Sequence, residues 1–218
     1  MSLAGAPRAG HNRSLRVLLS LCAATLLSGC TTPASVINPP TKDWRLVATS
    51  SDRERLREWR STFVEALASA RAAGHSAEID SEGALLKPDA ALGSGPIPNG
   101  TYRCRVIKIG AKSKGLLDYV TYPAFTCRIG PEQDLQGFAK LSGSQRPVGL
   151  IFPGDALRQV FLGTLVLGDE QGAMHYGRDS KRDVAGYIER VGPNQWRLLM
   201  PRPHFESKTD VLELVPAG

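Results

Sequence analysis

Residues 157–200 form a series of short apolar segments separated by turn residues. Nearly every position of 160–167 is a large apolar residue, so both faces of an extended chain would be apolar there. This composition is typical of a strand that is buried on both sides. Gly and Asp residues follow at 168–172, and Gly-Pro-Asn follows at 192–194. The alternation of apolar segments and turns predicts an antiparallel meander.

Similar segments continue through the second half of the chain. We expect strands at 100–109, 118–129, 135–141, 147–152, 158–167, 173–177, 184–191, 194–200 and 210–215. Short connections between sequential strands favour a meander closed into an up-and-down, calycin-like barrel of about eight strands. Closure also removes the unpaired edges that a long open meander would expose. Pro123 lies inside the second segment and lacks a backbone N–H, so it requires a bulge or a local edge there.

A helix is expected before the strands, which makes the fold mainly β with an N-terminal helix, an α+β arrangement. Within 52–73, apolar side chains recur at helical spacing: Leu56, Trp59, Phe63, Leu67 and Ala70. Ser51 and Glu54 fit a capping box, and Gly74 fits the position after the last helical turn. The apolar stripe predicts that this helix packs against the barrel.

Gly and Pro residues predict a crossing loop over 75–99, with at most a helical turn between Ala84 and Leu92. The barrel would then occupy 100–216. Residues 43–218 are therefore expected to form one globular domain, because a chain of 218 residues has room for one core of ordinary size.

The N-terminus contains three arginines and no acidic residue in its first 16 positions, followed by an apolar run at 17–27. This run of 11 residues is too short to span a bilayer and is typical of a signal peptide. The sequence Leu27-Ser28-Gly29-Cys30 comes next and resembles the lipobox of bacterial lipoproteins. An ordinary signal peptide with an incidental Cys30 is the alternative.

The lipobox resemblance implies that residues 1–29 are removed and that Cys30 carries acyl chains that anchor the protein to a membrane. Thr31 stands where an Asp would favour the inner membrane, so the resemblance points to the periplasmic face of the outer membrane. Residues 30–42 are rich in Thr, Pro and Ser and are expected to be a flexible tether. Removing the three arginines lowers the formal charge from +6 to +3, which gives no support to a nucleic-acid partner.

Four cysteines are present, of which Cys22 leaves with the signal peptide and Cys30 takes the lipid. Cys104 and Cys127 remain, and an even pair in an oxidising compartment predicts a disulfide. If the two cysteines lie opposite each other in a hairpin, Val106 faces Phe125 and Tyr102 faces Ile129, all on one side. A metal pair or a redox dithiol has less support, because the sequence has neither a CxxC motif nor a nearby His.

Motifs for catalysis are missing from the sequence. The four histidines lie in different segments without metal-ligand spacing, and no GxSxG, P-loop or GxGxxG sequence occurs. Ser144 is better explained as part of a hairpin turn than as a nucleophile, because no base can be assigned to it. We therefore expect no enzyme activity, no metal site and no cofactor.

A polar loop near 178–183 offers the candidate contact site. If the barrel opens at that end, Tyr176, Arg178 and Arg182 would line its mouth and meet an anionic group of a ligand or partner. The alternative is an exposed cluster of ion pairs that contributes little.

Several short motifs resemble one bacterial family. They are Gly100 to Arg105, Gly143 to Arg146, Phe161 to Glu170, Arg182 to Gly186 and Trp196 to Pro201. Together they are similar to the Gram-negative envelope family catalogued as domain of unknown function 4893, over about 43–216. This resemblance implies no activity.

The sequence therefore favours a non-catalytic envelope lipoprotein that binds a small apolar ligand or another envelope protein. The alternative is a periplasmic inhibitor of a lysozyme or protease, acting through a protruding loop at 110–117 or 178–184.

We predict that Cys30→Ala leaves the protein soluble in the periplasm or unprocessed, because the thiol that accepts the lipid is gone. Membrane fractionation and the mass of the mature protein measure this. A Cys30→Ala protein that still matures and sediments with membranes would rule out the anchor.

Overall fold

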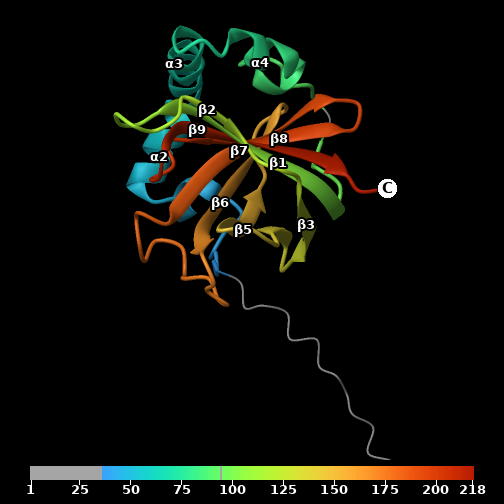
Figure 1. The fold of residues 1–218 in the computed structure, drawn as a ribbon. Coiled ribbons are helices and arrows are strands. Elements are labelled where there is room, and N and C mark those ends of the chain that lie inside the picture. Colours follow the sequence, from blue (N-terminus) through green and yellow to red (C-terminus); the bar gives the residue numbers. More distant parts are fainter. Residues whose placement is uncertain (1–35, 94) are drawn as a thin grey trace, which may run out of the picture. The chain divides into compact units, whose positions relative to one another are not determined.

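The computed structural model describes residues 36–93 and 95–218. Within them, nine strands form one antiparallel sheet in the order β2-β1-β3-β4-β5-β6-β7-β8-β9, and β1 also pairs with β9. Eight strands therefore close into an up-and-down barrel, and β2 is added outside it on β1 (Figure 1). The strands are β1 (Gly100–Ala111), β2 (Tyr119–Thr121), β3 (Phe125–Glu132), β4 (Leu135–Lys140), β5 (Gln145–Phe152), β6 (Arg158–Leu167), β7 (Asp183–Gly192), β8 (Gln195–Pro201) and β9 (Ser207–Pro216).

The predicted mainly β fold and its closed meander are confirmed, with two changes in the strands. The segment 118–129 is divided into β2 and β3, which pair with different halves of β1, and the break falls around Pro123. The strand predicted at 173–177 is wrong, since this segment belongs to the loop between β6 and β7. Gly177 has a φ of 83° there, and the Tyr176 hydroxyl is bound to a helix instead of packing on the sheet.

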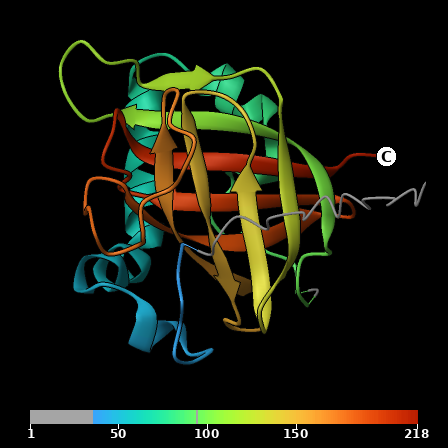
Figure 2. The ribbon, with the colours of Figure 1, turned by 90° about the horizontal axis from the view of Figure 1, so that it is seen from below.

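The helices cover the outside of the barrel (Figures 1 and 2). They are α1 (Trp44–Val47), α2 (Ser50–Arg57), α3 (Trp59–Ala72), α4 (Ser76–Ser81) and the short 3-10 helix η1 (Gly83–Leu86). The single helix predicted at 52–73 is therefore two helices, broken at Glu58, where φ is −96° and ψ is 8°. The break lets α2 pack on β7 while α3 packs on β1 and β9. The N-cap of α2 is Thr49, whose hydroxyl accepts a hydrogen bond from the Asp52 N–H, and not Ser51.

The loop predicted at 75–99 is also partly helical, because it contains α4 and η1. Ile79, Leu85 and Leu86 are buried and anchor these short helices to the outer core. Gly74 has a φ of 101°, which confirms its predicted place after the end of α3.

Two apolar layers explain why so many strands are apolar on both faces. Side chains such as Tyr102, Cys104 and Phe161 fill the barrel interior. Their neighbours along the same strands, such as Ile107 and Leu162, point outward and are covered by the helices. Because successive side chains of a strand point to opposite faces, each strand contributes to both apolar layers.

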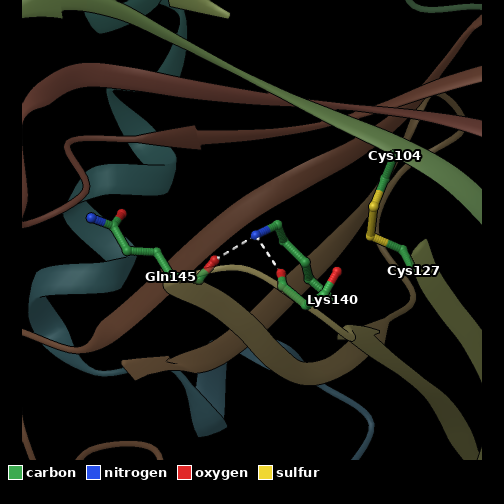
Figure 3. The surroundings of a disulfide bond; sticks show 5 residues. Cys104, Cys127, Lys140 and Gln145 are labelled. Carbon is green, nitrogen blue, oxygen red and sulfur yellow. Dashed lines mark hydrogen bonds between the residues drawn. A yellow bond between two sulfur atoms is a disulfide. The ribbon is translucent and has the colours of Figure 1, made fainter. Parts of the chain in front are cut away.

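The predicted disulfide between Cys104 and Cys127 is present, with a Cα–Cα distance of 5.9 Å. The register predicted around it was wrong by two residues: Cys104 pairs with Phe125, and Tyr102 pairs with Cys127. A shift of two residues keeps every side chain on its original face. Both cysteines therefore still point into the barrel and bond diagonally (Figure 3).

The tether predicted at 30–42 needs correction over 36–42, its described part. Ile37 is buried among side chains outside the barrel, and the Val36 carbonyl accepts a hydrogen bond from the Tyr176 N–H at 3.1 Å. An apolar side chain that can reach an open patch of the outer core docks there. The predicted signal peptide and Cys30 lie outside the described residues. No helix within the described residues is long and apolar enough to cross a membrane.

A buried arginine fixes the segment after η1 to the barrel. Arg197 on β8 is 0% exposed and pairs with Glu189 on β7, its Nε and Nη2 lying 2.7 and 2.5 Å from one carboxylate oxygen. Its Nη1 donates to the carbonyls of Leu85 and Lys87 at 2.7 and 2.8 Å. One side chain therefore satisfies both an internal carboxylate and the backbone of the crossing segment.

We predict that Arg197→Met lowers the free energy of unfolding by about 3–5 kcal/mol, because it leaves buried carbonyls and part of Glu189 without donors. Urea denaturation measures the change. Arg103→Met is the control, since Arg103 is exposed on β1 and its loss should change stability by less than about 0.5 kcal/mol. Equal stability of the two variants would contradict a structural role for Arg197.

Candidate ligand site at one end of the barrel

The interior of the barrel is apolar at its centre and polar at both ends. Lys108, Lys140 and Asp210 lie at one end, which we call the lysine end. Arg190 and Trp196 lie at the other, which we call the arginine end. A cavity opens at each end, and the two differ in how well their polar groups are matched.

The lysine end contains a cavity of about 90 Å³. Lys108 is buried beside it, and its Nζ lies 2.9 Å from Asp210, 3.2 Å from Glu206 and 3.1 Å from the Gln145 Oε1. Burial alone would lower the pKa of Lys108, but the attraction of the two carboxylates outweighs it, so the pKa lies above its usual value. This cation is fully matched within the barrel.

Lys140 is the second cation of the lysine end, and it has no carboxylate partner among the described residues. Its Nζ donates to the carbonyls of Ser142 and Gln145 at 2.8 and 3.0 Å (Figure 3). The Nζ also lies 3.9 Å from the centre of the Phe125 ring. Burial, with repulsion from Arg146 and Lys108, lowers the pKa of Lys140 to about 8. The three contacts use all the donors of the ammonium, so Lys140 needs no further partner at the lysine end.

The three residues predicted to contact a ligand or partner lie near the lysine end but not in its cavity. The Tyr176 hydroxyl donates to Asp52 at 2.5 Å and accepts from the Thr49 N–H at 3.1 Å. Burial and the Asp52 charge raise the pKa of Tyr176. Tyr176 thus joins the β6–β7 loop to α2.

Arg182 is also engaged within the fold: its Nη1 lies 2.6 and 2.8 Å from the two Glu170 oxygens, and its Nε lies 3.4 Å from Asp179. The Arg178 side chain is exposed and has no partner in the described part of the chain. Contact of Tyr176, Arg178 and Arg182 with a ligand stays a prediction.

The arginine end holds a larger cavity, a groove of about 470 Å³. One wall is the segment before β1, which places Ile97 inside the barrel, where it is 1% exposed. The Ile97 N–H donates to the Gln159 Oε1 at 2.7 Å, and its carbonyl accepts from the Gln136 Nε2 at 2.8 Å. The other wall is the loop between β5 and β6 at 153–157.

Two unmatched donors lie at this groove. Arg190 on β7 and Trp196 on β8 are direct cross-strand partners, beside a β-bulge between Arg190 and Gly192. The Arg190 Nε and the Trp196 Nε1 are buried, and neither has an acceptor among the described residues. An unmatched buried donor costs about 1–3 kcal/mol, so a pair of them needs an explanation.

A second arginine of the groove, Arg158, has carboxylate partners. The Arg158 Nε lies 2.6 Å from Glu189, and its Nη1 lies 3.6 Å from Asp155. Arg190 has no ion pair or side-chain hydrogen bond within 36–93 and 95–218, so it is the cation that the groove leaves without an anion. A bulge beside it fits a functional position, because bulges redirect side chains.

The sequence of 44–214 matches the family described as Domain of unknown function (DUF4893). The chain belongs to the DUF4893 family. No curated protein and no solved structure matches it. Both Arg190 and Trp196 lie inside the DUF4893 match, as do the two disulfide cysteines. The family's description names no activity, so the chemistry of this DUF4893 domain has to be argued from the groove itself.

The side chains that line the groove of the DUF4893 domain offer contacts to a ligand. The described residues that line it include no Ser, Thr, Cys, His or Lys. Within the described residues, no group of three His, Cys, Asp or Glu side chains could hold a metal ion. Its available chemistry is an unpaired guanidinium, an indole N–H and an apolar wall.

Arg190 and Trp196 were not predicted as site residues from the sequence, although the sequence contains one signal for Arg190. Along β7 the inward positions are Val184, Gly186, Ile188 and then Arg190, so a charged residue interrupts an otherwise apolar face. That interruption becomes visible only when the strand phase is fixed.

The lowered pKa of Lys140 predicts a pH dependence of stability in the DUF4893 domain. Between about pH 8 and about pH 10.5 the unfolded chain binds more protons at this lysine than the folded one, so folding gains stability as the pH rises. We predict that the unfolding free energy of the wild type rises relative to Lys140→Met by about 1–3 kcal/mol between about pH 7 and about pH 10. Urea denaturation at both values measures it.

Lys108→Met is the control for this experiment. Because the pKa of Lys108 is raised, its contribution is complete below about pH 10.5 and falls only above that value. The wild type should therefore gain less over Lys108→Met than over Lys140→Met, and what it gains comes from the repulsion between the two lysines. A flat difference for Lys140→Met would show that Lys140 titrates normally.

Proposed function

We propose that this protein is a cell-envelope lipoprotein whose barrel binds a small ligand at the arginine end without transforming it. The observation that carries the proposal is Arg190, a guanidinium without an anion at a groove of about 470 Å³. Grooves that bind small molecules usually measure about 300–1,000 Å³ and combine apolar walls with a few polar groups. Among the described residues that line the smaller cavity at the lysine end, no buried side-chain donor lacks an acceptor.

The envelope location is supported by the sequence alone. The basic N-terminus, the apolar run and Leu27-Ser28-Gly29-Cys30, which resembles a lipobox, support export and lipidation at Cys30. The disulfide between Cys104 and Cys127 fits an oxidising compartment, such as the periplasm. Export to the periplasmic face of the outer membrane is the location that we propose.

Inhibition of a lysozyme or protease is the second candidate, and one observation favours it. The loop between β1 and β2 carries Leu117, which is 70% exposed, next to Leu116, which is 39% exposed. Exposed apolar side chains on a loop can enter a partner's pocket. Such a role would use the outside of the barrel and would leave the groove without a function.

We predict that Ala156→Trp, which fills the groove from the β5–β6 loop, weakens ligand binding at least about tenfold. Ligand-observed NMR with a library of anionic, neutral and cationic fragments measures binding to the purified protein. Ala124→Trp is the matched control, because Ala124 is an exposed alanine outside both cavities.

Fragments should bind the wild type and the control alike. If Ala156→Trp binds the same fragments with unchanged affinity, the groove is not the ligand site. Loss of lysozyme or protease inhibition in Leu117→Asp would then favour the inhibitor role.

A further inference from the structure

We propose that the ligand of the arginine end carries a single carboxylate, which pairs with Arg190, and an apolar body that lies along the groove. This inference rests on the proposed ligand-binding function of the same groove and names the chemical class that the groove selects. It follows from the charges of the lining residues, the geometry of the guanidinium and the composition of the walls.

An anion is required because Arg190 is the unbalanced charge of the groove. A guanidinium stays protonated at any physiological pH, so the charge cannot be removed by titration. The other charged side chains of the lining have partners: Arg158 with Glu189 and Asp155, and Asp134 with Lys42 at 3.7 Å. A ligand anion would complete the only pairing that the described residues leave open here.

The guanidinium is also partly presented to the groove. The Arg190 Nε is buried, whereas the two terminal nitrogens are not. None of the three has an acceptor in the described part of the chain. A planar fork of this kind binds both oxygens of a carboxylate in two parallel hydrogen bonds. The hydrogen bond from the Leu92 N–H to the Arg190 carbonyl, at 2.7 Å, fixes the main chain that carries this guanidinium.

Trp196 supports the same sign of charge. Its Nε1–H lacks an acceptor, and the side chain is only 7% exposed beside its cross-strand partner Arg190. A buried N–H without an acceptor carries a partial positive charge that no oxygen offsets. A negative group bound at Arg190 would stabilise both side chains, even without direct contact with the indole.

One carboxylate fits better than a phosphate or a sulfate. A single guanidinium balances one negative charge, and the described lining offers no second free cation. Asp134 and Asp155 lie at the same groove and would repel a dianion more strongly than a monoanion. The groove therefore disfavours the multiply charged oxyanions that clusters of basic residues bind.

The walls determine the rest of the ligand. Much of the lining is apolar: Pro96, Leu135, Ile151, Pro153, Leu157 and Ile188. A cavity of about 150 Å³ is enough for benzene, so a groove of about 470 Å³ accepts an aromatic ring or a branched chain next to the carboxylate. The class is thus a monocarboxylic acid with an aromatic or aliphatic body.

The test compares benzoate with benzamide, and hexanoate with hexanamide, on the purified ¹⁵N-labelled protein. Each pair has the same shape and differs in charge. We expect the acid to bind at least about tenfold more tightly than its amide, because a hydrogen bond to a charged group is lost in the amide. The indole signal of Trp196, assigned with Trp196→Phe, should shift as the acid binds.

Arg190→Gln should remove the preference for the acid, whereas Arg103→Gln, the same change at an exposed site, should retain it. Both variants are first compared with the wild type by their backbone spectra. If Arg190→Gln does not fold, Arg190→Lys replaces it, since a lysine keeps the charge but loses the two parallel bonds and should bind the acid with intermediate affinity.

The outcomes separate this inference from the proposed function. If amides bind as well as acids and Ala156→Trp blocks both, the barrel binds ligands but the carboxylate class is wrong. Tighter binding of inorganic phosphate than of benzoate through Arg190 would also overturn the class. If neither acids, amides nor phosphate perturb the groove, the ligand-binding function fails as well.

Discussion

The pairing of β1 with β9 holds the whole molecule in its closed form. The ladder runs from Tyr102 and Pro216 at one end to Ala111 and Ser207 at the other, and it joins the first barrel strand to the last. Without it the sheet would have two long exposed edges and no interior. With it, each strand gains an inner and an outer face, and the two apolar layers become possible. Because the partners lie about 100 residues apart, this closure belongs to the slow, non-local class of contacts.

Closure also creates two ends of the barrel, and their buried polar groups are paired to different extents. At the lysine end, Lys108 and Asp210 pair with each other, and Lys140 contacts carbonyls and an aromatic ring. At the arginine end, the segment carrying Ile97 fills the centre of the opening but leaves Arg190 and Trp196 unmatched beside it. Buried donors without acceptors lower the stability of a barrel, so folding alone does not require them. Unmet polar groups of this kind are therefore better explained by binding than by folding.

Local patterns were sufficient to predict much of the fold, and tertiary contacts account for the rest. Alternation of apolar residues located the strands and their closure, since each inner and outer position has a fixed phase. It could not fix the register at Cys104, because a shift of two residues leaves the phase unchanged. Nor could it reveal the break at Glu58, where two helices turn to follow a curved surface. The environment of Arg190 depends on residues from four segments, which no single window of sequence contains.

The docking of 36–42 connects two loops of the barrel that are far apart in the sequence. Val36 meets Tyr176 in the β6–β7 loop, at the lysine end, whereas Asn38 meets Gln133 and Lys42 meets Asp134 in the β3–β4 turn, beside the groove. These residues therefore contact the β6–β7 loop and the β3–β4 turn from the outside of the barrel. Because no strand pairing among the described residues joins these two segments, the docked residues add a connection that the sheet does not provide. Release of 36–42 from the outer wall would therefore uncover the apolar outer core around Ile37 without opening the barrel.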